Sequence, residues 1–437
     1  MKPWLVRAGL TKAGLASALA LILAACATTP RAPTMTIDEI ARAYVSLVLE
    51  IDAHESGYVD AFYGPTEWRD AARANPRERQ QLKTDADALA TSLRQIRASD
   101  PEMANRARVL LAQITSARFR LDMIDGKRVK FADEAERLFA LRPKLKPLSS
   151  YDAALASIDK LIPGEGPLNA RVESFRANFS IAPNRVRAVM DAAIAECRSR
   201  TRAHLDLPAN ESFDMALVKD KSWGAYNYYQ GDNHSKIEIN TDMPMSIGNV
   251  LILGCHEGYP GHHVQGIYKE RNFRTRGWPE YSVQPLYAPE SPLNEGGADF
   301  GVKLAFPGDE QVRFEAETLY PLAGLDPATA VAYDALRRAV VELEGALLTI
   351  SQKHLDGEIS REQAITLIQK YKMVPRDVAE QSLAFDRDYR SYVMNYSVGR
   401  DLVAAYVDRH GGQDANARWA AYEHILSTPV LPADLTK

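Results

Sequence analysis

Along the first half of the chain, apolar residues recur at every third or fourth position, as on one face of a helix. The first such stretch carries them at Ile37, Ile40, Tyr44, Leu47 and Ile51. The segment just before it, Thr36-Ile37-Asp38-Glu39, has the form of a capping box. The same periodicity predicts further helices over residues 79–96, 103–123, 131–140, 150–161 and 183–205. Residues 36–206 are therefore predicted to form an N-terminal α-helical scaffold.

The pattern changes after residue 207. Residues 224–229 and 235–240 are short, aromatic-rich segments with alternating polarity, and the Gln-Gly-Asp-Asn sequence between them is typical of a hairpin. We therefore expect a small antiparallel β-sheet ahead of an apolar helix over residues 246–257. Further on, residues 328–355 are predicted as one long helix, and Ser360 opens the next helix with a capping box. Residues 207–437 are expected to pack with the scaffold as one unit.

Candidate chemistry is concentrated at the end of that apolar helix. Residues 256–263 have the sequence His-Glu-Gly-Tyr-Pro-Gly-His-His, which places three of the nine histidines and one carboxylate in eight residues. Neutral imidazoles are good zinc ligands, and a glutamate beside the first histidine is placed to take a proton from a water that the metal activates. The sequence therefore predicts one zinc ion, with His256 as a ligand and Glu257 as general base.

Two histidines compete to be the second ligand. On a continuous helix His262 lies about 600° from His256 and His263 about 700°, which favours His263. Pro260 cannot occupy the interior of such a helix, because it lacks an N–H and its ring would clash with the carbonyl four residues earlier. The helix must bulge or break there, and Gly261 gives the backbone freedom to turn. We favour His262 as the ligand and keep His263 as the alternative, in a supporting role or as a transition-state donor.

A catalytic zinc ion usually takes three protein ligands and keeps one position for water. Glu295 is the best third ligand, because it opens an apolar segment that can continue as a helix. The small residues Gly296 and Gly297 would allow this helix to approach the first metal-binding helix closely. Asp299 follows Glu295 by one helical turn and is placed to hold a ligating imidazole by its other nitrogen.

The His-Glu-Gly-Tyr-Pro-Gly-His-His segment, followed by Asn294-Glu295-Gly296 and Ala298, resembles a bacterial family known as domain of unknown function 885. The resemblance extends from about residue 36 to the C-terminus. Members of that family resemble zinc metallopeptidases of the gluzincin type. The resemblance implies a mainly α, zincin-like fold, with His256, His262 and Glu295 as metal ligands and Glu257 as general base. Gly297 stands where many members carry tryptophan, which leaves the substrate open.

A hydrolase of this kind needs a donor for the oxyanion that forms during the reaction. Tyr396 and Arg400 place a phenol and a guanidinium one turn apart, in a segment similar to a tyrosine-glycine segment near the end of family members. His263 and His234, the latter beside the predicted hairpin, are further candidates. Each of these residues could instead have no role in the site, because tyrosine is a frequent core residue and charged side chains commonly lie on solvated surfaces.

The N-terminus has the features of a lipoprotein signal. Basic residues precede an apolar stretch over residues 15–25, which is too short to span a bilayer as a helix. The following Leu23-Ala24-Ala25-Cys26 resembles a lipobox, in which the cysteine receives a diacylglyceryl group. The sequence therefore predicts a lipoprotein signal peptide over residues 1–26 and a tether over 27–35. The expected location is the cell envelope, at the periplasmic face of the outer membrane.

Only Cys197 and Cys255 remain after Cys26, so the chain has at most one disulfide. We expect Cys255 to be a small buried thiol and not a metal ligand, because adjacent helical residues point about 100° apart.

The composition narrows the function further. A formal charge of −4 over 437 residues argues against a nucleic-acid partner. The combined prediction is a zinc-dependent hydrolase that cleaves peptide or other small amide bonds, with the membrane contacted only through the lipid. The alternative is a non-catalytic envelope lipoprotein that keeps the metal-site skeleton for binding or structure. The sequence leaves open the mode of cleavage, the metal actually bound and the oligomeric state.

Overall fold

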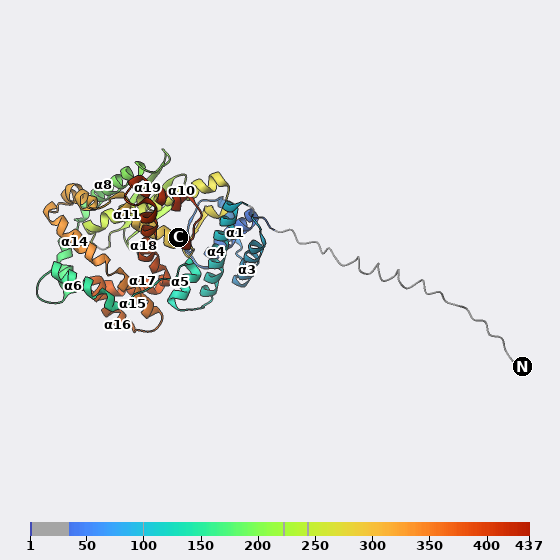
Figure 1. Ribbon diagram of the computed structural model, residues 1–437, viewed down its shortest axis with the longest axis horizontal. Helices are drawn as coiled ribbons and strands as arrows, with labels where there is room; N and C mark the ends of the chain where they lie inside the picture. The colour runs from blue at the N-terminus through green and yellow to red at the C-terminus, as the bar shows by residue number, and fades with distance from the viewer. Residues whose placement is uncertain (2–34, 99, 222, 243) are drawn as a thin grey trace. The chain divides into compact units, whose positions relative to one another are not determined.

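The protein is represented by a computed structural model that describes residues 1, 35–98, 100–221, 223–242 and 244–437. Ile37–Lys437 form one compact unit that is mainly helical and contains two small sheets (Figure 1). Cys26 lies outside the described residues, as do the predicted signal peptide and tether apart from their outermost residues. Among the described residues, no helix is both long and apolar enough to cross a membrane.

The helices of the N-terminal part follow the predicted periodicity. They are α1 (Ile37–His54), α2 (Thr66–Ala74), α3 (Arg79–Gln95), α4 (Pro101–Ile124), α5 (Phe131–Phe139), α6 (Asp152–Leu161), α7 (Leu168–Ala177) and α8 (Pro183–Arg202). The prediction missed α2 and α7, which begin directly after Pro65 and Pro167. Proline ends a preceding helix, but its fixed φ also suits the start of a new one, so a proline that looks like a turn residue can introduce a helix.

The strands of the described residues form two small sheets. β3 (Ala225–Gly231) and β4 (His234–Asn240) form the predicted antiparallel hairpin. The expectation of a purely antiparallel sheet is wrong, because β2 (Ser212–Val218) joins the other side of β4 in parallel. The second sheet pairs β1 (Val59–Phe62) with β5 (Val283–Pro285) across more than 200 residues of chain, which no local pattern indicated.

The C-terminal part is almost entirely helical. Its helices are α9 (Ile247–Leu253), α10 (His262–Arg276), α11 (Ser291–Ala305), α12 (Glu310–Phe314), α13 (Tyr320–Ala323), α14 (Ala330–Val341), α15 (Glu344–Leu355), α16 (Arg361–Ile368), α17 (Arg376–Tyr389), α18 (Met394–Gly411) and α19 (Ala415–Ser427). The capping box at Ser360 is confirmed at the start of α16. The single helix expected over 328–355 is wrong: it is interrupted between α14 and α15. Gly345, a poor helix former, lies at the restart, where the hydroxyl of Tyr151 packs against it.

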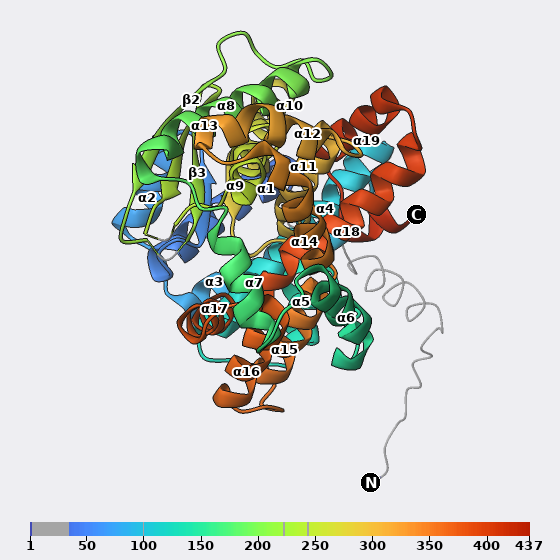
Figure 2. The same cartoon turned by 90° about the vertical axis from the view of Figure 1, so that its left-hand side faces the viewer.

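Helices α11 and α18 lie side by side in both views (Figures 1 and 2). A Cβ atom added to Gly296 of α11 would lie 2.0 Å from the carbonyl carbon of Gly399 in α18, so only glycine permits this approach. Helix α11 also approaches the first metal-binding segment, as predicted, since a Cβ atom on Gly301 would lie 3.0 Å from Pro260. Gly296, however, serves the contact with α18, which the sequence did not predict. The tightest contact of α11 is with α18, which carries Tyr396.

Candidate metal centre

Three of the predicted site residues converge. His256, His262 and Glu295 each offer one ligand atom, and these atoms all lie within 4.8 Å of one another. The Nε2 atoms of His256 and His262 are 3.5 and 3.7 Å from the Oε2 atom of Glu295. Two imidazoles and one carboxylate are the ligand set found in many catalytic zinc sites.

The path of the chain between the two histidines explains which of them joins the cluster. Helix α9 ends at Leu253, and residues Gly254–Gly258 form a π-helical turn that carries His256. The chain then folds back, so that the N–H of Gly261 donates to the carbonyl of Cys255. A Cβ atom on Gly261 would lie 1.8 Å from the carbonyl oxygen of His256, and only glycine fits there. Helix α10 then starts at His262, whose ring centroid lies 4.6 Å from that of His256.

Hydrogen bonds hold both imidazoles in the orientation that a metal requires. His256 donates from Nδ1 to Asp299 Oδ1 at 2.8 Å, and His262 donates from Nδ1 to Gln265 Oε1 at 2.9 Å. The amide of Gln265 is itself oriented, because its Nε2 donates to the carbonyl of Asn294 at 2.7 Å. With the proton on Nδ1, each ring presents the lone pair of Nε2 toward Glu295, so the residues fit a bound metal ion.

The carboxylate of the cluster is held as well. The hydroxyl of Tyr392 donates to Glu295 Oε1 at 2.7 Å, which leaves Oε2 facing the two histidines. Burial opposes ionisation of Glu295, but His262 and His256 together keep the pKa of its carboxyl far below the usual range. Burial alone would lower the pKa of His256, yet Asp299 and Glu295 raise it well above the usual value. The carboxylates of the cluster therefore favour a positive charge between the ligand atoms. A metal ion that replaces the protons on the imidazoles would supply this charge.

Glu257 and Tyr396 line a cavity of about 460 Å³ beside the cluster. Glu257 is 5% exposed, and its Oε2 atom has no hydrogen-bond partner among the described residues. Burial raises the pKa of Glu257, and the charges on His256 and His262 act against this. The ring of Tyr396 stacks on His256 with centroids 6.4 Å apart. Burial, followed by the charge of Glu295, raises the pKa of Tyr396 well above the usual value, so its phenol stays protonated.

His263 lies away from the cluster. Its Nε2 donates to Glu211 Oε2 at 3.2 Å, and its Nδ1 accepts from the hydroxyl of Ser235 at 2.8 Å. Glu211 is fully enclosed and also binds Tyr259, Arg198 and Arg202. Although burial favours the neutral acid, these donors lower the pKa of Glu211 to about 2. Glu211 thus holds both Tyr259 and His263, which lie on either side of the Pro260-Gly261 turn. His263 therefore has a structural role and is not a ligand of the cluster.

Two other predicted donors also lie elsewhere. Arg400 donates from Nη1 to Glu344 Oε2 at 2.5 Å and lines a separate pocket that Asp299 also borders. His234 is held by Ser212 and Asp214 on the surface of the β2–β4 pair. Neither lines the cavity beside the cluster. Arg400 lies one turn further along α18 than Tyr396, and there Glu344 and Asp401 hold its guanidinium.

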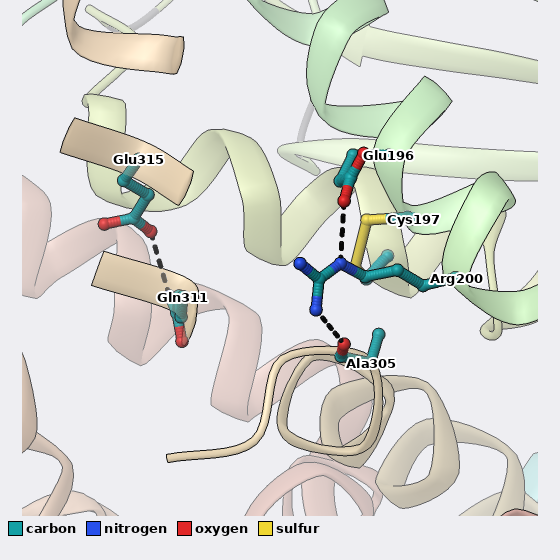
Figure 3. Close-up of a disulfide and its surroundings, with 7 residues drawn as sticks. Glu196, Cys197, Arg200, Ala305, Gln311 and Glu315 are labelled. Atoms are coloured by element: carbon teal, nitrogen blue, oxygen red, sulfur yellow. Dashed lines mark hydrogen bonds and ion pairs between the residues drawn. A yellow bond between two sulfur atoms is a disulfide. The ribbon is translucent and has the colours of Figure 1, made fainter. Parts of the chain in front are cut away.

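Helix α8 is bonded to the π-helical turn that carries His256 and to α11, which carries Glu295. Cys197 forms a disulfide with Cys255, the residue before His256, so the expectation of a free buried thiol is wrong. Beside this disulfide, Arg200 donates to Glu196 and to the carbonyl of Ala305 at the end of α11 (Figure 3). The cysteines are 58 residues apart, and no local pattern pairs them; their contact depends on how α8 packs against the π-helical turn.

Sequence reasoning missed several residues of the site. Gln265 lies three residues after His262 on the same helix, and this spacing was a usable signal. Tyr392 precedes Tyr396 by four residues, so the same helical spacing could have indicated it as a neighbour of the site. Asp60 had no signal, because it enters the cavity from β1, far away in the sequence.

Comparison with known proteins shows the fold and little more. No family model matches the chain, and no curated protein matches it, so the resemblance to domain of unknown function 885 rests on the motif residues. A predicted lipoprotein from Colwellia psychrerythraea has a similar crystal structure, with a TM-score of 0.51 over 92% of this chain and 75% of that chain, at 14% identity. A predicted lipoprotein of unknown function from Shewanella oneidensis aligns with a TM-score of 0.48 over 90% of this chain and 81% of that chain, at 13% identity.

Proposed function

We propose that this protein is a zinc-dependent hydrolase of the cell envelope that cleaves peptide or similar amide bonds at a gluzincin-type site in a zincin-like arrangement. The observation that carries the proposal is the convergence of His256, His262 and Glu295, each held by its own hydrogen-bond partner and bordering a cavity that contains Glu257. The N-terminal lipobox at Cys26 supports an envelope anchor, and the Colwellia protein of similar fold is described as a predicted lipoprotein.

In this proposal His256, His262 and Glu295 hold the zinc ion. When bound, zinc acts as a Lewis acid that activates water and polarises the substrate carbonyl. Glu257 accepts the proton of the attacking water at its unpartnered Oε2 and passes it to the leaving amine. The phenol of Tyr396 donates a hydrogen bond to the developing oxyanion. Asp299 and Gln265 hold the imidazoles of His256 and His262 in a fixed orientation while negative charge develops on the substrate oxygen.

The first test is the zinc content of the purified full-length protein, measured by elemental analysis. We expect about one zinc per chain, retained in Glu257→Gln and lost in His256→Ala. His234→Ala is the matched control, because it removes a histidine that lies outside the cluster, and it should keep its zinc. Hydrolysis of a peptide library by the wild type, abolished in Glu257→Gln, would support the catalytic assignment. Full activity in Glu257→Gln would reject Glu257 as general base.

A second candidate function is a non-catalytic envelope lipoprotein. It is favoured by the Colwellia protein of similar fold, which is described as a predicted lipoprotein. The two functions differ in the fourth coordination position, since a structural zinc is closed by four protein ligands whereas a catalytic one keeps water. Zinc bound stoichiometrically without hydrolysis of any peptide or amide would favour this second function.

A further inference from the structure

The cavity beside the metal cluster is acidic and aromatic. The described residues that line it include the carboxylates of Asp60, Glu257 and Glu295, and no lysine or arginine is among them. Much of the remaining wall is aromatic, with Trp223, Tyr226, Tyr228 and Tyr389 as examples. The proposed function gives roles to Glu257 and Glu295 but none to Asp60, so one carboxylate of the cavity has no assigned role.

Asp60 accepts hydrogen bonds only from neutral groups. The hydroxyl of Tyr226 donates to its Oδ1 atom, and Gln284 Nε2 donates to its Oδ2 atom at 3.0 Å. Among the described residues, no lysine, arginine or histidine forms an ion pair with it. Burial raises the pKa of Asp60, and the bond from Tyr226 partly offsets this rise. The charges of His262 and Lys269 also lower the pKa of Asp60, but they act from a distance, Lys269 being held by Gln284. A cation that binds the carboxylate directly would form the ion pair that the described residues leave unmade.

Asp60 lies close to the reacting centre. Tyr226 binds Asp60, and the next residue on β3, Asn227, donates from Nδ2 to the backbone carbonyl of Glu257 at 2.6 Å. Asp60 lines the same cavity as Glu257, and the charges of His262 and Glu295 act on its carboxyl. A group bound to Asp60 would therefore share this cavity with an amide positioned at the metal cluster.

We propose that Asp60 binds a primary ammonium group of the substrate, so that the cavity selects peptides with such a group beside the amide that is cleaved. The inference rests on the proposed hydrolase function. Aromatic faces attract cations as well, so the rings around Asp60 favour the same ligand. A free N-terminal α-amine and a lysine side chain both supply this chemistry. Among the described residues, a substrate carboxylate finds no lysine or arginine side chain in this cavity.

The test measures binding, so it does not depend on turnover. Zinc-supplied Glu257→Gln protein, full length and in detergent, is titrated by calorimetry with three probes of similar size. They are phenylalanyl-alanine amide, its N-acetyl derivative and N-acetyl-phenylalanyl-lysine amide. We expect at least one of the two ammonium-bearing probes to bind roughly tenfold more tightly than the neutral probe, as one well-placed ion pair provides. The one that binds more tightly identifies the N-terminus or the side chain as the source of the charge.

Variants of Asp60 then assign the preference. Asp60→Asn should reduce it to about twofold or less, and Asp60→Glu should restore part of it. Asp214→Asn is the matched control, because Asp214 is an exposed aspartate on β2 outside the cavity, and it should leave the preference unchanged.

Equal binding of all three probes, tighter binding of the neutral probe, or no binding of any probe at millimolar concentration would overturn the inference, as would a preference that survives in Asp60→Asn. The zinc content of the same samples and peptide hydrolysis by the wild type report on the proposed function separately. A zinc-loaded, active enzyme without ammonium preference therefore rejects only the role of Asp60.

Discussion

Replacing Gly296 by alanine should separate helices α11 and α18. The added Cβ atom would lie 2.0 Å from the carbonyl carbon of Gly399 and 2.3 Å from the backbone nitrogen of Arg400, whereas ordinary contacts begin at about 3.4 Å. The obstacle is backbone on both sides, so no side-chain rotation relieves it and the helices must move apart by about 1 Å. Overpacking of a core typically costs about 1–3 kcal/mol, and the higher helix propensity of alanine returns up to about 1 kcal/mol. Because the obstacle is backbone on both sides, the cost lies at the upper end of that range, and we expect a net loss of about 2 kcal/mol.

The neighbouring glycine provides the control. A Cβ atom on Gly297 would meet Gln265 and Tyr422 at 3.5 Å, which is ordinary contact, so Gly297→Ala should leave stability unchanged or raise it by up to about 1 kcal/mol. Urea unfolding followed by circular dichroism measures both variants. Gly296→Ala should also weaken zinc binding in a chelator competition, because α11 carries Glu295 and α18 carries Tyr396. Equal stabilities for the two variants, with equal zinc affinity, would refute the close helix contact.

Three further outcomes are expected. Replacing both Cys197 and Cys255 by alanine removes a crosslink that closes a loop of about 58 residues and should lower the free energy of unfolding by about 4 kcal/mol; a loss below 1 kcal/mol in urea unfolding would argue against the disulfide. The pKa of Glu211 is about 2 in the folded protein and ordinary when unfolded, so its stabilising contribution is complete above pH 5 and is lost as the pH falls. Between pH 6 and 3 the difference in unfolding free energy between wild type and Glu211→Gln should therefore shrink by about 2 kcal/mol, and a constant difference would contradict this role. Cys26→Ser should move the protein from the membrane fraction to the soluble fraction of its host, and unchanged membrane association would reject lipid anchoring.

The sequence determined the local features of this protein. Periodic apolar residues are enough to define amphipathic helices such as α3, α4 and α8, because a helix of this kind must bury one face whatever it packs against. The β3–β4 hairpin and the capping box of α16 are equally local, since each depends on residues within a few positions. The same holds for the concentration of histidines at residues 256–263, which identified the candidate metal site before any fold was known.

Tertiary structure decided everything that joins distant segments. The choice of His262 over His263 depended on the backbone folding tightly over Gly261, and on Glu211 holding His263 on the opposite side. The sequence brought Glu295 to the site, but Tyr392 and Asp60 reach the same cavity from the turn before α18 and from β1, and helical or strand periodicity carries no information about such meetings. The Cys197–Cys255 pairing and the α11–α18 contact are of the same kind. Local sequence fixes which face of an element is apolar, whereas the packing of whole elements determines which polar groups are brought together on the remaining faces.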